Sequence, residues 1–194
     1  MKLKQADIGK IRKAMEKALD AKRFEHTLGV AYTASCLAMC HEENVKNAEL
    51  AGLLHDCAKC LDNSKKIKIC EKHNIHINSI EAKNPFLLHA KVGSFLAMEY
   101  YGVRDKDIIN AILNHTTGRP GMTKLEKIIY IADYIEPNRK QAPNLAVIRR
   151  LAFVDLDQAL LKILEDTLSY LETIKTDIDP MTQKTYDYYK EGKR

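Results

Sequence analysis

Apolar residues recur every three or four positions along most of the chain. The spacing starts at Ile8, Ile11, Met15 and Leu19 and is typical of one face of an α-helix. Helices are expected over residues 5–20, 23–40, 85–101, 105–115 and 155–174, others begin near residues 44, 62 and 123, and a short one follows residue 180. Strand-like alternation is confined to a few residues near Ile75. The pattern therefore predicts an all-α protein with a single domain over residues 1–194.

Residues with special backbone preferences mark the ends of several expected helices. Thr123 and Glu126 have the spacing of a capping box. Asn84 and Pro85 look like an N-cap followed by a first-turn proline. Gly102 is placed to end its helix in the left-handed conformation. Segments 76–85, 116–123 and 137–144 are richest in turn-forming residues and are expected to be loops.

The composition is that of a globular protein, with 45% hydrophobic and 29% charged residues. No run of about 18 apolar residues could cross a membrane, and the charged N-terminus lacks the apolar stretch of a signal peptide. A cytoplasmic protein without membrane contact is therefore expected. The five cysteines are odd in number and are expected as free thiols. Residues 1–22 are strongly basic, but nothing resembles a nucleic-acid module, so nucleic-acid binding is not favoured.

Four histidines and two aspartates lie in apolar surroundings on successive expected helices. They are His26, His55, Asp56, His89, His115 and Asp133. A single such histidine is more often a satisfied core residue than a ligand, but buried aspartates need a counter-charge or a metal ion. Nitrogen and oxygen donors without thiolate suit iron, manganese, zinc, cobalt or nickel, and argue against a structural zinc site. Six donors fit two bridged ions better than one. The remaining histidines, at positions 41, 73 and 76, lie among charged residues and are expected to be solvated.

These residues resemble a known signature. His26, the pair His55-Asp56 and Asp133 match the H…HD…D pattern of the HD-domain metal-dependent phosphohydrolases. His89 and His115, inserted before the last aspartate, look like the subset with a dinuclear centre. The strings RFEHTLGVA, AGLLHDCAK and HTTGRPGMTKLEKIIYIADYIEPNR are similar to the bacterial YqeK family, whose members are symmetrical diadenosine tetraphosphate hydrolases. The resemblance covers a core of about residues 22–187 and implies an HD-domain helical bundle.

The resemblance implies a division of the ligands between two ions. His26, His55, Asp56 and Asp133 would hold the first ion. Asp56 would bridge to a second, which His89 and His115 complete. The centre of this family is commonly iron, although the donor set alone also suits manganese, cobalt, nickel or zinc.

Further candidates follow from spacing and from the resemblance. Lys59 and Arg23 share helical faces with Asp56 and His26 and could neutralise phosphate. Arg139 could fold back over the site after the Pro137 break, and Thr182 is suggested by the resemblance alone. The candidate substrate contacts are Arg23, Lys59, His89, Thr116, Thr117, Gly118, Asp133, Arg139 and Thr182, and the candidate catalytic residues are Asp56, Lys59 and Asp133.

The expected chemistry is metal-assisted hydrolysis of a phosphoanhydride. A metal-activated water would attack phosphorus, and cleavage of diadenosine tetraphosphate at its middle bridge would give two ADP. Three alternatives are another HD phosphohydrolase acting on nucleoside mono- or triphosphates, a nucleotide-binding regulator, and a metal-dependent oxygenase. A fourth is an all-α domain without a metal site, in which the core histidines only make hydrogen bonds within the protein. The sequence leaves open the choice between adenine and guanine, and whether the chain forms a homodimer.

Overall fold

The computed structural model describes residues 2–192, and no strand occurs among them. Its α-helices are α1 (Ile8–Ala18), α2 (Ala21–Cys40), α3 (Val45–Leu54), α4 (Asn63–Lys72), α5 (Ser79–Lys83), α6 (His89–Glu99), α7 (Lys106–Asn114), α8 (Lys124–Ile135), α9 (Leu145–Ala152), α10 (Leu156–Thr173) and α11 (Pro180–Lys190). A short 3₁₀ helix (Pro85–Leu88) precedes α6. The all-α class is thus confirmed. Positions 1, 193 and 194, which the expected domain includes, lie outside the described residues.

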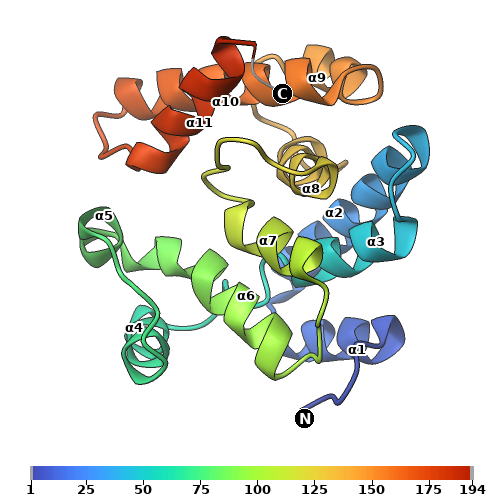
Figure 1. Cartoon of the computed structure of the whole chain (residues 1–194), viewed down its shortest axis with the longest axis vertical. Coiled ribbons are helices and arrows are strands. Elements are labelled where there is room, and N and C mark those ends of the chain that lie inside the picture. The colour runs from blue at the N-terminus through green and yellow to red at the C-terminus, as the bar shows by residue number, and fades with distance from the viewer. Residues whose placement is uncertain (1, 193–194) are drawn as a thin grey trace.

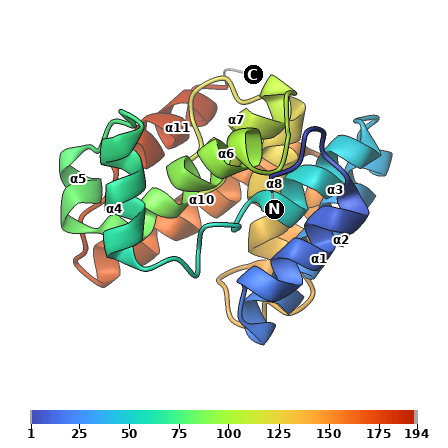
Figure 2. The ribbon, with the colours of Figure 1, turned by 90° about the horizontal axis from the view of Figure 1, so that it is seen from below.

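Three helices form the middle of the molecule. Figure 1 shows α6, α7 and α8 there, with α9, α10 and α11 on one side and α1 on the other. The view in Figure 2 places α4 and α5 at one end and α1 to α3 at the opposite end. The main apolar core joins α2, α3, α7, α8 and α10. A smaller cluster between α4 and α6 contains Ala58, Cys70, Leu88 and Val92.

Helices α2 and α3, which position two of the candidate ligands, approach each other very closely. A Cβ atom at Gly52 would lie 2.7 Å from the Cα of Ala31, so only glycine allows the α3 backbone to approach α2 this closely. Ala31 and Ala34 are buried on the facing side of α2. Small residues at this crossing therefore fix the distance between the helix that carries His26 and the helix that ends at His55.

Several expected helix ends are present in the structure. Thr123 and Glu126 make both halves of a capping box at the start of α8. Gly102 has a φ of 70° after α6, and the amide of Leu3 donates to the carbonyl of Tyr100 beside it, at 2.7 Å. The basic helix expected over residues 5–20 is α1. The five cysteines are free, and none of the helices in the described part of the chain is long and apolar enough to cross a membrane.

Two helices lie where the sequence predicted a loop or predicted nothing. Segment 76–85 contains α5, which starts at a capping box formed by Asn78 and Glu81. Asn84 is the predicted N-cap and Pro85 the first-turn proline, but they start the 3₁₀ helix, and the Asn84 side chain makes no capping bond and instead donates to the carbonyl of Ile80 in α5. The hydrophobic pattern predicted no helix over the residues that form α9. His41 is only partly exposed, and its Nε2 donates to the carbonyl of Ala152 at the end of α9.

Candidate metal-dependent active site

The expected ligands come together where several helices end. His55 and His115 directly follow α3 and α7, and His89 is the first residue of α6. The other ligands are Asp56 in the turn after α3, His26 in α2 and Asp133 in α8. Helix ends suit this role because their last carbonyls have no partner within the helix and can orient a neighbouring side chain. The candidate ligands therefore lie either within helices or in the turns that directly follow α3 and α7.

Asp56 is the centre of the cluster. Its Oδ1 lies 3.3 Å from His89 Nε2 and 3.6 Å from His115 Nε2, and its Oδ2 lies 3.6 Å from His55 Nε2. Two groups of donor atoms form in this way, His26 with His55 and Asp56, and Asp56 with His89 and His115. In each group the donor atoms lie within 4.8 Å of one another, and Asp56 belongs to both. The geometry thus suits two ions that share one carboxylate.

Hydrogen bonds settle which nitrogen of each histidine carries a proton. The Nδ1 atoms of His55, His89 and His115 donate to the backbone carbonyls of residues 52, 86 and 112, at 2.7–2.8 Å. A carbonyl only accepts, so each Nδ1 is protonated and each Nε2 of a neutral ring is an acceptor. His89 Nε2 and His115 Nε2 face each other at 3.1 Å, beside the Asp56 carboxylate. Acceptors crowded in this way require a cation between or beside them.

Burial keeps the rings of His55 and His89 neutral. It lowers the pKa of His55 to about 4 and the pKa of His89 to about 3, the latter with help from His115 and Lys59. Burial alone would raise the pKa of Asp56, but interactions with the neighbouring His55, His115 and Lys59 side chains hold it well below its ordinary value. Within residues 2–192, the buried polar atoms without a hydrogen-bond partner include His26 Nε2, His55 Nε2 and Asp56 Oδ1. Neutral imidazoles and an ionised carboxylate are the forms that bind metal, so the residues fit a divalent cation.

His26 differs from the other three histidines because side chains hold it on both sides. Its Nε2 lies 3.1 Å from Asp133 Oδ1, and its Nδ1 lies 3.1 Å from Glu136 Oε1. Burial lowers the pKa of His26, but these two carboxylates outweigh it and raise the pKa above its ordinary value. Metal-ligating histidines commonly donate their other nitrogen to a carboxylate, which fixes the ring. Glu136 is buried and occupies this place.

Sequence reasoning missed Glu136 and the glycine that makes room for it. A Cβ atom at Gly29 would lie 2.5 Å from Glu136 Oε2. That oxygen accepts from the amide of Asn138 at 2.7 Å, which anchors the turn after α8. The signals were present in the spacing, since Gly29 and Glu136 each follow a candidate ligand by three residues and share its helical face.

Cationic side chains line the approach to the cluster. Arg23 Nη1 donates to Asp56 Oδ2 at 2.8 Å, and Lys59 Nζ lies 3.1 Å from His89 Nε2 and 3.7 Å from Asp56 Oδ1. Arg139 folds back as expected, and its Nη2 donates to the carbonyl of Asp133 at 2.9 Å. Three positive groups beside an acidic cluster can bind phosphate oxygens once cations neutralise the carboxylates.

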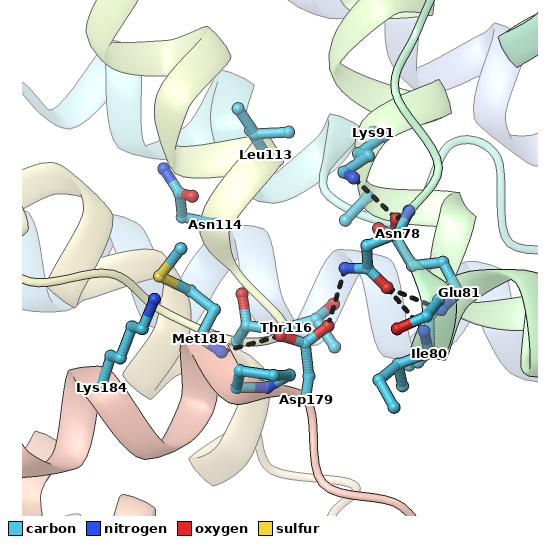
Figure 3. Close-up of a pocket in the computed structure, with 15 residues that line it drawn as sticks. Asn78, Ile80, Glu81, Lys91, Leu113, Asn114, Thr116, Asp179, Met181 and Lys184 are labelled. Atoms are coloured by element: carbon cyan, nitrogen blue, oxygen red, sulfur yellow. Dashed lines mark hydrogen bonds and ion pairs between the residues drawn. The ribbon is translucent and has the colours of Figure 1, made fainter.

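Two spaces near the candidate ligands have Thr116 in common as a wall residue. A pocket of about 150 Å³ is lined by residues that include Lys59, His89, His115 and Asp133. A larger cavity of about 380 Å³ lies between α5, α6, α7 and α11 (Figure 3). Thr116 lines both spaces, and its hydroxyl lies 3.2 Å from His115 Nε2.

The walls of the larger cavity come from four separate segments. Figure 3 shows Leu113 and Asn114 on α7, Met181 and Lys184 on α11, and the side chain of Asn78 paired with Asp179. Asn78 Nδ2 donates to Asp179 Oδ2 at 3.3 Å, and this bond ties the start of α11 to the start of α5. Lys91 does not contact the ligand cluster, and its Nζ pairs with Glu81 at 2.7 Å. The cavity thus exposes mainly apolar surface, with polar and charged residues from all four segments in its wall.

Three candidate substrate contacts have different positions. Thr117 lines the larger cavity. Gly118 is buried with a φ of 64°, and a Cβ atom there would lie 2.7 Å from Thr185 on α11. Thr182 is also buried and is not among the residues that line the cavity, whereas its neighbours Met181 and Lys184 are. The structure therefore does not bring Gly118 or Thr182 to the cavity surface.

Comparisons with known proteins agree with this geometry. The HD domain family matches residues 23–138. A Bacillus subtilis protein named bis(5'-nucleosyl)-tetraphosphatase, symmetrical, is 40% identical over 92% of this chain and 95% of its own length. A Staphylococcus aureus protein of the same name is 37% identical over 93% of this chain and 92% of its own. The crystal structure of a protein from Clostridium acetobutylicum, described as a predicted HD superfamily hydrolase involved in NAD metabolism, has a TM-score of 0.93 and 39% identity, over 97% of this chain and 100% of that one. The chain therefore belongs to the HD domain family and, within it, to the YqeK-type group of the symmetrical bis(5'-nucleosyl)-tetraphosphatases.

Proposed function

We propose that this protein hydrolyses diadenosine tetraphosphate symmetrically to two molecules of ADP and depends on divalent metal ions. The observation that carries the proposal is the buried cluster of acceptors around Asp56, which lies between cationic side chains and a cavity of nucleoside size. The names of relatives with 37% and 40% identity support the choice of substrate.

The six predicted ligands would hold the ions. His26, His55 and Asp133 would complete the first position, His89 and His115 the second, and Asp56 would belong to both. We propose a di-iron centre, although the nitrogen and oxygen donors also suit manganese, cobalt, nickel or zinc. When bound, such ions polarise phosphate oxygens and lower the pKa of water.

The chain's own cations would bind the polyphosphate. Lys59 and Arg23 already lie within hydrogen-bond or ion-pair distance of Asp56, so they can pair with the non-bridging oxygens of a phosphate beside it. Such groups stabilise the negative charge that grows on these oxygens as the anhydride bond breaks. Arg139 would contact the phosphates from the α8 side, and the Thr116 hydroxyl would donate at the junction with the larger cavity.

One nucleoside would occupy the larger cavity. Its apolar wall, with Leu113 and Met181, suits the face of a base, and the amides of Asn78 and Asn114 suit its polar edge (Figure 3). Thr117 would contact this nucleoside directly. Gly118 and Thr182 would act by shaping the wall. Volumes of about 300–1,000 Å³ are usual for small-ligand sites, and the 380 Å³ cavity lies in this range.

Product chromatography tests the proposal. The protein would be incubated with diadenosine tetraphosphate and Fe(II), Mn(II) or Co(II), with a chelator as control. ADP as the sole product, lost on chelation, is the expected result. ATP with AMP would contradict symmetrical cleavage, and stoichiometric metal without turnover would favour a different nucleotide substrate or a binding protein. A guanosine analogue in the same assay tests the choice of base, while the cytoplasmic location and a homodimer stay predictions.

A further inference from the structure

A second groove shares part of its wall with the ligand pocket. It has a volume of about 600 Å³ and lies between α10 and the loop that follows α8. The residues that line it include Tyr134, Arg139, Gln141, Pro143, Thr167 and Tyr170; we call it the α10 groove. Tyr134, Arg139 and Thr167 also line the ligand pocket. The pocket therefore shares wall residues with two other spaces, Thr116 with the larger cavity and these three residues with the α10 groove.

The chemistry of the α10 groove suits a nucleoside. The ring of Tyr134 is half-buried, and the side chain of Tyr170 is 57% exposed. Any nucleobase can stack on an aromatic ring or on a guanidinium group. Arg139 supplies a guanidinium group here. The Gln141 amide adds a donor and an acceptor for the edge of a base.

The groove is held open by contacts that use no ligand. Arg149 Nη2 donates to the carbonyl of Arg139 at 3.1 Å, which fixes the loop against α9. Asn144 Nδ2 lies 2.9 Å and 3.0 Å from the two carboxylate oxygens of Asp166 on α10. Both ends of the loop are therefore fixed, and ligand sites that are formed in advance bind without an ordering cost.

Symmetrical cleavage requires a second nucleoside site. Each half of a dinucleoside tetraphosphate is a nucleoside diphosphate, so the bond that breaks lies midway between two chemically similar nucleosides. The larger cavity can hold the nucleoside on only one side of this bond. Arg139, which is held at Asp133, lies at the junction between the ligands and the α10 groove, where phosphates of the other half would pass. We propose that the α10 groove binds the second nucleoside, an inference that rests on the proposed function.

Replacement of Tyr170 tests this subsite, because its side chain is exposed and its loss leaves the core intact. In Tyr170→Ala we expect the KM for diadenosine tetraphosphate to rise about tenfold, as for loss of one stacking partner. The inhibition constant of ADP should change by less than twofold, since ADP can still bind through the larger cavity. Tyr170→Phe retains the ring and should retain the wild-type KM. Tyr100→Ala, at an exposed tyrosine after α6, is the matched control and should change neither constant.

The outcomes separate this inference from the proposed function. Wild-type protein that releases no ADP would overturn the proposed function and the inference together. Wild-type turnover with a KM in Tyr170→Ala within twofold of wild type would overturn the subsite alone. A parallel rise of KM and of the ADP inhibition constant would also overturn it, because that result indicates damage to the ligand pocket. Loss in Tyr170→Phe equal to the loss in Tyr170→Ala would contradict stacking.

Discussion

Replacement of Gly29 by alanine should weaken metal binding without contact with any metal ligand. The added Cβ atom would lie 2.5 Å from Glu136 Oε2 and 3.3 Å from its Cδ. Gly29 lies in the middle of α2, whose position is fixed by its close crossing with α3, so the Glu136 side chain must move. Its Oε1 then leaves His26 Nδ1, which lies 3.1 Å away, and the orientation of the His26 ring is no longer fixed.

The expected magnitudes differ between stability and metal affinity. Alanine stabilises a helix by about 1 kcal/mol relative to glycine, while loss of a hydrogen bond to a charged group costs about 1.5–3 kcal/mol. These effects oppose each other, so the metal-free variant should unfold within about 2 kcal/mol of wild type. Partners of metal-ligating histidines typically contribute about 10–100-fold to metal affinity. We therefore expect metal affinity to fall by that factor while the fold persists.

Two measurements check this expectation. A competition titration with a coloured chelator gives the affinity for Mn(II) or Co(II), and urea denaturation of the chelator-treated protein gives its stability. Gly9→Ala is the matched control, since a Cβ atom there meets only Asp7 Oδ1 at 3.5 Å, and it should leave metal affinity unchanged. Glu136→Gln removes the charge and should reproduce the loss. Wild-type affinity in Gly29→Ala would refute the role of Glu136.

Three further predictions concern the ligand cluster itself. Asp56→Ala should abolish hydrolysis and metal binding but retain the helical circular dichroism spectrum. An active variant with full metal content would contradict a site in which two metal ions share Asp56. Lys59→Ala should retain its metal content and lower kcat about 100-fold, as for loss of one group that stabilises developing charge, and unchanged kcat would exclude that role. The metal-free protein should lose stability as the pH falls from 6.5 towards 4. Since burial lowers the pKa of His55 to about 4, the unfolded chain binds the extra proton first, and His55 alone contributes about 3 kcal/mol of this loss; equal urea midpoints at pH 7 and pH 5 would contradict it.

Local sequence signals predicted most of the helices but not α5 and α9. Thr123 with Glu126 marks the start of α8, because a capping box satisfies backbone amides within one turn and needs no distant partner. The same pattern at Asn78 and Glu81 starts α5, but that helix has only five residues and lies in a segment rich in turn-forming residues. α9 directly follows the turn-rich segment 137–144 and depends on packing against α10. Stability that comes from tertiary packing is not visible in local spacing.

The clustering of the candidate ligands could be predicted because ionisable residues in apolar surroundings are rare and conspicuous. The residues that orient them could not, since Glu136 and Gly29 acquire their role only when α2 and α8 lie side by side. Gly118, in contrast, was predicted to contact the substrate but does not line the cavity. Its place directly after His115-Thr116-Thr117 favoured a substrate contact, but its positive φ instead lets the chain turn tightly against Thr185. Position along the chain says which residues are near a ligand, but it does not say which way they face.

Three of the candidate ligand histidines donate to backbone carbonyls of their own chain segments. The rate at which the protein loses metal should therefore report on local unfolding of these segments. Each Nδ1 donates to a carbonyl three residues earlier, so the ring keeps its direction only while that last turn of helix is formed. Opening of the final turn of α7, for example, would release His115 without disturbing the rest of the molecule. Ion loss and amide hydrogen exchange in these short turns should therefore share one rate-determining opening. Ligand loss by this route would begin at helix ends, at a free energy well below that of global unfolding.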